Sequence, residues 1–347
     1  MNPSKNDENA GRLRLLKSYI IESDHDVPEG SFKTEKFSFN IVNTDVENLK
    51  IMQISDGHNH LEMFLEMQNN RFLVLHTNTL SDLAANVIKE LVDSQHHNFD
   101  HMWFHSMFLR QIPEKEGNAF RGIGIKYSNE YLVNECADTE DLGVSASGSL
   151  ATRLLDIVEN DDVIKHRSAC NKIVITRGNT TSLESFVQDE ISNNGYFSVR
   201  KGKSIQDHLR LIDIVKEDYV STIKTIEDIR IGLVDINGKT LVEGRPFDFK
   251  FPNEIKDLNS FLTTLFNCEK PFKLWGLKSQ IAKDYFRVAA VDLHTGSPMD
   301  FEVASDIMRV YLSKESCGST ILRLLTNLQA YFDSGITCKQ IPYCVSK

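Results

Sequence analysis

Histidines are the side chains of this sequence with the clearest potential for metal or acid–base chemistry. Eight of the eleven lie within residues 1–150, and seven of those lie between positions 58 and 105. His58 and His60 follow Asp56 in the string Asp-Gly-His-Asn-His. In a strand, side chains at i and i+2 point to the same face, so both imidazoles could bind one ion with Asp56 nearby. The alternative is that these are polar residues at the start of a strand.

The same string resembles the D-x-H-x-H opening of amidohydrolase-type metal hydrolases over five residues. The resemblance implies an eight-stranded β/α barrel and further His and Asp ligands on later strands. The residues available for those positions are His166, His208 and Asp292. The hairpin predicted directly after His60 favours a fold other than that barrel.

Three further histidines recur at every fourth position, namely His97, His101 and His105. We expect residues 97–112 to form a helix that ends before Pro113, which would stack the three rings along one face. An i, i+4 histidine pair suits zinc, and Asp93 or Asp100 could supply a carboxylate. The alternative is that the rings line the polar side of an amphipathic helix or are partly buried in it.

Asp235, Asp248 and Lys250 follow the order found in metal-dependent nucleases of the PD-(D/E)xK type. Such enzymes use a carboxylate pair to bind Mg²⁺ or Mn²⁺ and a lysine near the attacking water. An Asn237-Gly238 turn would pair Asp235 with Thr240, which leaves Asp248 roughly 25 Å further along a strand. Only a chain reversal at residues 244–246 would bring the two carboxylates together.

Residues 165–210 are locally basic, with eight basic and four acidic side chains. Arg200, Lys201 and Lys203 lie just before a helix predicted over residues 205–227. A helix N-terminus favours anions, so this cluster could bind a phosphate, and it is the region through which nucleic acid could bind. The alternative is a solvated charged face.

The elements that would position these groups are hairpins, meanders and amphipathic helices. The clearest are a meander over 34–76, helices over 79–92, 205–227 and 319–332, and a hairpin over 229–242. Ser204 and Asp207 resemble a capping box at the start of the second helix. Since hairpins outnumber strand–helix–strand units, the sequence predicts an α+β fold with antiparallel sheets packed with amphipathic helices.

The length and the charge distribution suggest two domains. The chain has 347 residues, which corresponds to about two domains. We expect a disordered N-terminus, an acidic His-rich α+β domain, a linker or exposed loop, and a charge-balanced α+β domain, over residues 1–10, 11–133, 134–149 and 150–347. All of the net charge of −10 lies within residues 1–150, which argues against a general nucleic-acid binder.

The cysteines and the hydropathy indicate the cellular compartment of the protein. The six cysteines are widely separated and contain no C-x-x-C motif, which suits a reducing cytoplasm. The polar N-terminus has no apolar region of a secretory signal, and no stretch of 18 apolar residues predicts a membrane span. We therefore expect a cytoplasmic protein without a membrane partner.

Two classes of function remain. The first is a non-catalytic interaction protein, a subunit or adaptor of a larger assembly that binds a protein partner. The second is a metal-dependent hydrolase, a phosphodiesterase or nuclease, that would use zinc at the histidines or magnesium or manganese at Asp235, Asp248 and Lys250. No catalytic motif in the sequence is complete, and we favour the first class mainly because the second needs a geometry that the predicted turns oppose.

Overall fold

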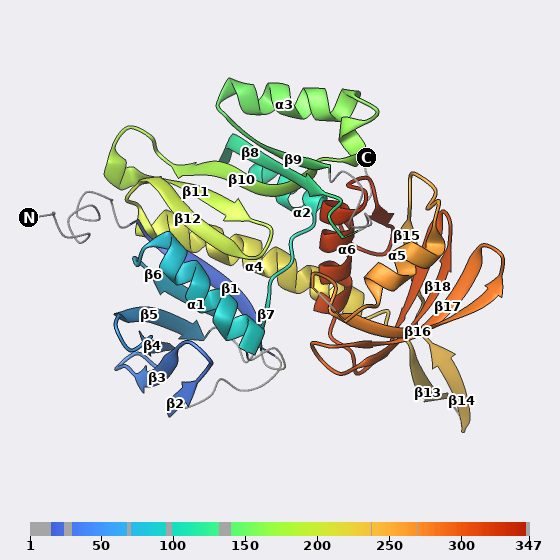
Figure 1. Ribbon diagram of the computed structural model, residues 1–347. Coiled ribbons are helices and arrows are strands. Elements are labelled where there is room, and N and C mark those ends of the chain that lie inside the picture. The colour runs from blue at the N-terminus through green and yellow to red at the C-terminus, as the bar shows by residue number, and fades with distance from the viewer. Residues whose placement is uncertain are drawn as a thin grey trace, which may run out of the picture. The chain divides into compact units, whose positions relative to one another are not determined.

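The computed structural model describes residues 15–23, 30–67, 71–94, 99–131, 140–236, 238–268 and 270–344 (Figure 1). It divides into two compact units, one with residues 1–101 and 196–201 and the other with 102–195 and 202–347. The predicted α+β class with antiparallel sheets is confirmed, since the paired strands run antiparallel and six α-helices accompany them in the described residues. None of the described helices combines the length and hydropathy needed to cross a bilayer.

The first unit is an antiparallel sheet with one helix. Its strand order is β2-β3-β4-β5-β6-β1-β12, and β7 also pairs with β1. The elements are β1 (Lys17–Ser23), β2 (Gly30–Lys33), β3 (Ser38–Asn43), β4 (Leu49–Ser55), β5 (His60–Met67), β6 (Phe72–Thr77), α1 (Ser81–Ser94), β7 (Phe99–His101) and β12 (Tyr196–Gly202). The meander predicted over 34–76 is confirmed as β3 to β6.

Alternation along the strands gives this sheet one buried face and one exposed face. Phe39, Met52 and Met63 are buried in the core. Helix α1 closes that core with the apolar residues whose helical spacing predicted it, Ala84, Val87, Ile88, Leu91 and Val92. Burial of a large apolar side chain contributes about 1.5–3 kcal/mol, so this face fixes the register of the strands.

The second unit begins with an antiparallel sheet of order β11-β10-β8-β9. Its elements are α2 (Ser106–Gln111), η1 (Ile112–Glu114), β8 (Asn118–Ser128), β9 (Asp141–Ser147), α3 (Ser149–Asn160), η2 (Ile164–His166), β10 (Ala169–Gly178), η3 (Leu183–Ser185), β11 (Phe186–Ser192) and α4 (Ile205–Glu227). Helix α4 packs against β10 and β11. Its predicted cap is confirmed, since the Asp207 N–H donates to Ser204 Oγ at 3.3 Å.

The stretch predicted as a linker or exposed loop, 134–149, contains a strand. Strand β9 pairs with β8 from Gly122↔Ser147 to Ser128↔Asp141, while residues 134–139 lie outside the described residues. The strand is mostly exposed because it is the edge of its sheet. Its small polar residues are therefore typical of a protected edge strand as well as of a loop.

The remainder of the second unit holds a six-stranded sheet of order β16-β17-β18-β19-β15-β20 and a separate two-stranded sheet, β13-β14. Their elements are β13 (Gly232–Ile236), β14 (Lys239–Glu243), β15 (Phe247–Lys250), α5 (Leu258–Leu265), β16 (Leu274–Ala282), β17 (Tyr285–Asp292), β18 (Pro298–Ala304), β19 (Ile307–Leu312), α6 (Ser319–Tyr331) and β20 (Thr337–Cys338). Helix α6 is buried along its length from Ser319 to Gln329. The β13–β14 hairpin extends away from the six-stranded sheet (Figure 1).

Candidate functional site

The helix predicted over residues 97–112 is wrong in its first part. Phe99–His101 forms strand β7, which pairs with β1, and α2 begins only at Ser106. The i, i+4, i+8 stacking of the three histidines therefore does not form, because pairing with β1 determines the backbone of this segment. His97 lies outside the described residues. His105 instead caps α2, and burial lowers its pKa to about 4.

Asp56 closes the turn between β4 and β5. One carboxylate oxygen accepts the N–H groups of His58 at 2.9 Å and Asn59 at 2.6 Å, and the other accepts the Asn59 side-chain amide at 2.9 Å. These hydrogen bonds lower the pKa of Asp56 to about 2. His60 then begins β5 of an antiparallel sheet, so the barrel implied by the resemblance is wrong. Within the described ranges, no three His, Cys, Asp or Glu side chains gather closely enough to hold a metal ion.

The two carboxylates of the nuclease hypothesis lie on different sheets. Asp235 pairs with Thr240 on the β13–β14 hairpin as predicted, and its carboxylate accepts the Gly238 N–H at 2.8 Å. Asp248 and Lys250 lie on β15 of the six-stranded sheet. The Asp248 carboxylate accepts hydrogen bonds from the Arg309 Nε and the side-chain amide of Gln340, both at 3.0 Å. The Asp235 carboxylate thus stabilises the hairpin turn, and the Asp248 carboxylate joins β15 to Arg309 and Gln340.

The basic cluster is divided between the two units. Arg200 and Lys201 lie on β12 within the first unit, whereas Lys203 belongs to the second unit. The Lys203 ammonium donates to Glu184 at 2.9 Å, which raises its pKa. Anion binding at these residues stays a prediction.

A groove of about 1550 Å³ is lined by residues of β2 to β5 in the first unit. His58 and His60 line it, together with side chains from the segment after β6, where Asn78 and Leu80 lie. Phe64, which is half exposed, adds an aromatic surface to the same groove. The groove therefore combines polar side chains with an aromatic side chain.

The floor of this groove is a hydrogen-bonded row of side chains. The strand register aligns four residues across β2, β3, β4 and β5, namely Ser31, Asn40, Gln53 and Glu62. The Ser31 hydroxyl donates to Asn40 at 2.9 Å, the Asn40 amide to Gln53 at 3.0 Å, and the Gln53 amide to Glu62 at 3.2 Å. All donors in this row point toward β5, so each amide is fixed in one orientation.

A second row runs parallel to the first, two residues later in β2 and β4 and two residues earlier in the antiparallel β3 and β5. Its members are Lys33, Ser38, Ser55 and His60. Because i and i+2 in a strand share a face, both rows point into the groove. Lys33 on β2 and Glu62 on β5 place a positive and a negative charge on the two outer strands of the floor. The arrangement can bind an elongated polar ligand through hydrogen bonds and two charges of opposite sign.

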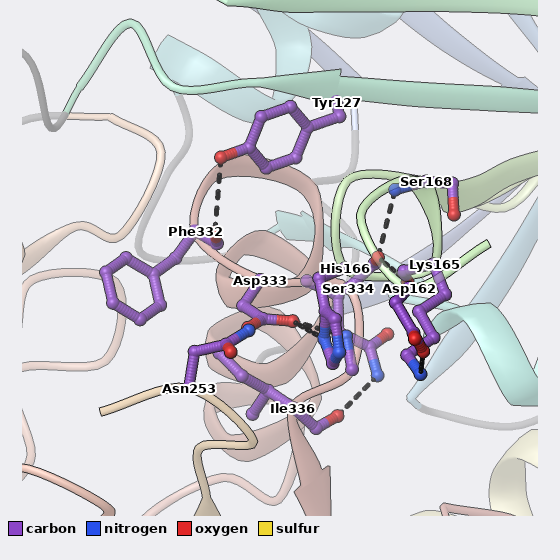
Figure 2. Close-up of polar contacts among 12 residues, drawn as sticks. Tyr127, Asp162, Lys165, His166, Ser168, Asn253, Phe332, Asp333, Ser334 and Ile336 are labelled. Atoms are coloured by element: carbon purple, nitrogen blue, oxygen red, sulfur yellow. Dashed lines mark hydrogen bonds and ion pairs between the residues drawn. The ribbon is translucent and has the colours of Figure 1, made fainter. Parts of the chain in front are cut away.

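A second polar site lies in the other unit, where Asp333 follows the end of α6 (Figure 2). The His166 Nδ1–H donates to one Asp333 oxygen at 3.0 Å, and the Gly335 N–H donates to the same oxygen at 2.8 Å. The Asn253 amide donates to the other oxygen at 2.8 Å. The carboxylate therefore holds the imidazole ring in one orientation, and a Cβ on Gly335 would lie only 2.8 Å from the His166 Nδ1.

The His166 side chain is 22% exposed, and its other ring nitrogen has no hydrogen-bond partner within the described part of the chain. Ser334 holds the backbone of this segment by donating to the Lys165 carbonyl at 2.6 Å and accepting the Ser168 N–H at 2.9 Å (Figure 2). An oriented imidazole with an open nitrogen can accept a proton from a bound water or substrate.

Two further hydrogen-bonded pairs are buried inside the second unit. His208 on α4 donates to Asp189 on β11 at 2.9 Å, and both side chains are 0% exposed. Asp292 at the end of β17 accepts hydrogen bonds from Thr320 and Arg323 on α6, and all three residues are buried. These pairs join helices to strands and do not open to solvent.

The fold and these sites define an α+β protein of antiparallel sheets with a polar groove in its first unit. The chain belongs to the family of MJECL33-like proteins, which it matches over residues 4–343. It is 29% identical over 359 residues to a Methanocaldococcus jannaschii protein described as uncharacterized protein MJECL33, covering 92% of this chain and 85% of that protein. No solved structure matches the chain.

Proposed function

We propose that this protein is a non-catalytic interaction protein, a subunit or adaptor of a larger cytoplasmic assembly, and that its groove holds an extended segment of a partner protein. The observation that carries this proposal is the hydrogen-bonded row of Ser31, Asn40, Gln53 and Glu62 on the groove floor. The cysteines of the described residues are free thiols, which supports a reducing compartment.

The dimensions of the row support a peptide as the ligand. Four strands have three gaps of about 4.8 Å, so the row is about 14 Å long. An extended peptide rises about 3.3 Å per residue, and four residues therefore follow the row from β2 to β5. The two amides retain donors and acceptors beyond their mutual hydrogen bonds, and these match the N–H and C=O groups of a peptide.

Preorganisation and charge support the same ligand. Binding costs about 0.5–1.5 kcal/mol for each flexible side chain that it orders, and the row already restrains Asn40 and Gln53. Lys33 and Glu62 favour a peptide with an acidic side chain over β2 and a basic side chain over β5. The aromatic ring of Phe64 provides an apolar contact beside these polar rows.

A random peptide library displayed on phage tests the proposal, with selection on the wild-type protein and counter-selection on the double variant Asn40→Ala/Gln53→Ala. Each lost hydrogen bond costs about 0.5–1.5 kcal/mol, so we expect selected peptides to bind the double variant about 10-fold more weakly. We also expect the selected peptides to carry an acidic residue at the end that lies near Lys33 and a basic residue at the end that lies near Glu62.

A control double variant in the second unit tests whether the loss of peptide affinity is specific to the groove. Asn160→Ala/Gln280→Ala removes two exposed amides from the second unit and should leave the affinity for the peptides unchanged. Selected peptides that bind Asn40→Ala/Gln53→Ala as tightly as the wild type would contradict the proposal. Failure to enrich any peptide on the wild-type protein would contradict it as well.

Hydrolysis is the second candidate function, and the observation that favours it is the partly exposed imidazole of His166, whose Nδ1 is held by Asp333 at 3.0 Å. In that function the imidazole would take a proton from the attacking water. Turnover of bis(p-nitrophenyl) phosphate with Mn²⁺ or Zn²⁺ tests it. Loss of turnover in His166→Ala would assign the reaction to this pair, and loss in His58→Ala would assign it to a metal at the groove. No turnover by the wild type would remove this candidate.

A further inference from the structure

The β13–β14 hairpin exposes apolar side chains on both of its faces. Leu233 and Val242 lie opposite each other on one face and are 70% and 71% exposed. Leu241, opposite Val234 on the other face, is 47% exposed. A two-stranded ribbon without a covered face is marginally stable in water. This hairpin therefore requires a surface that covers it.

The outer edge of β14 is open to strand pairing. Within the described residues, β14 pairs with β13 alone. Ile236 and Lys239 flank the two-residue turn, and hydrogen-bonded and non-hydrogen-bonded pairs alternate from there along the ladder. The N–H and C=O groups of Thr240 and Val242 consequently point away from β13. They form an edge that can accept another antiparallel strand.

The sequence of β14, Lys-Thr-Leu-Val-Glu, complements itself in the antiparallel direction. When two copies pair with Leu241 at the centre, Lys239 of each copy lies opposite Glu243 of the other. The same register places Thr240 opposite Val242, so the outward N–H and C=O groups meet as hydrogen-bonded pairs. A shift by two residues in either direction places a charged residue opposite Leu241 and loses both ion pairs.

This register also covers the apolar side chains of one face. Val234 lies opposite Leu241 within the hairpin, and Leu241 would lie opposite Leu241 of the second copy. The result is an apolar row across four strands, flanked on each side by one Lys239–Glu243 pair. One Glu243 oxygen contacts Lys314 of its own chain, which leaves the other oxygen for Lys239 of the second copy. The contact has the two-fold self-complementarity of an isologous dimer.

We propose that this protein forms a two-fold dimer through antiparallel pairing of β14 with β14 of a second copy. The proposal does not depend on the groove, which lies on the other unit. Two five-residue strands bury an area at or below the lower end of specific interfaces, where dissociation constants reach the micromolar range. The dimer should therefore appear at micromolar concentrations.

Analytical ultracentrifugation of the full chain from 1 to 200 μM tests the proposal with charge variants. Lys239→Glu places like charges opposite each other in both pairs, as does Glu243→Lys, and we expect each variant alone to dimerise at least 10-fold more weakly than the wild type. Mixed together, the two variants restore both ion pairs and should form a heterodimer. Lys283→Glu makes the same charge change on an exposed turn and should dimerise like the wild type.

Three results of these measurements would overturn the proposed dimer. A wild-type protein that stays monomeric at 200 μM would overturn the proposal. A dimer that Lys239→Glu does not weaken, or a mixture of the two variants that stays monomeric, would overturn it as well. Circular dichroism of each variant verifies that the fold is intact. Peptide binding in the groove should be the same for Lys239→Glu and the wild type, so failure of the dimer leaves the proposed function to its own test.

Discussion

Removal of the Asp292 carboxylate should strongly destabilise the second unit. Asp292 accepts hydrogen bonds from the Arg323 guanidinium, the Thr320 hydroxyl and the His294 N–H at 2.9 Å. Asp292 and Arg323 are each 1% exposed, so water cannot replace the lost carboxylate without opening the core. The variant Asp292→Ala therefore leaves a buried cation without this counter-charge at the N-terminal half of α6.

The magnitude follows from the burial of the pair. Deletion of one partner of a buried ion pair costs about 3–5 kcal/mol, whereas an exposed pair contributes about 0–1 kcal/mol. At about 2–4 °C per kcal/mol for a unit of this size, Asp292→Ala should lower the Tm by about 6–20 °C. The exposed pair between Arg110 and Glu159 provides the control, and Glu159→Ala should change the Tm by no more than a few degrees.

Differential scanning calorimetry of the full chain and its two variants measures both shifts. A Tm for Asp292→Ala within about 2 °C of the wild type would refute the reasoning that this pair joins α6 to β17. A large shift for Glu159→Ala would show that exposed pairs carry more of the stability than the structure indicates.

Three further predictions concern single residues. Gly202→Ala should lower the free energy of unfolding by about 2 kcal/mol or more, since Gly202 has a φ of +84° and an added Cβ would lie 2.2 Å from the Phe186 carbonyl oxygen. Urea unfolding measures this loss, with Gly143→Ala as the unhindered control. Equal losses of stability in the two variants would contradict the prediction. Burial lowers the pKa of His105 to about 4, below its unfolded value of about 6.5. The free energy of unfolding should therefore fall by about 3 kcal/mol as the pH drops from 6.5 to 4. His105→Asn should reduce this pH dependence, and an unchanged pH dependence would assign it to other groups. Burial raises the pKa of Cys170 to about 12 and of Cys344 to about 11, so iodoacetamide at pH 8 should label the exposed Cys268 faster than either of them. Mass spectrometry that finds Cys170 labelled as fast as Cys268 would contradict the burial.

Local patterns predicted the elements whose sequences carry their own signal. Helix α4 has apolar residues at helical spacing and a side-chain cap, and its bounds agree with the predicted 205–227. The Asn-Gly turn predicted the β13–β14 pairing. Strand β7 has only three residues, too few for a period, and its conformation depends on pairing with β1.

The sites depend on contacts that are distant in the sequence. Asn40 and Gln53 are aligned only by the register of β3 and β4, so the groove floor requires the strand pairing as well as the residue types. That row was missed, although pairing the predicted meander strands about their turns would have found it. His166 and Asp333 lie 167 positions apart, and neither segment carries a signal for the other.

The most direct test of the central claim is an NMR measurement of the side-chain amide groups of Asn40 and Gln53. These signals are assigned from the single variants Asn40→Ala and Gln53→Ala, and a selected peptide is then titrated into the wild-type protein. The claim predicts that both amide signals shift with the same saturation curve, while the side-chain amide of Asn160 in the second unit stays in place. A bound peptide that leaves the signals of Asn40 and Gln53 unmoved would contradict it.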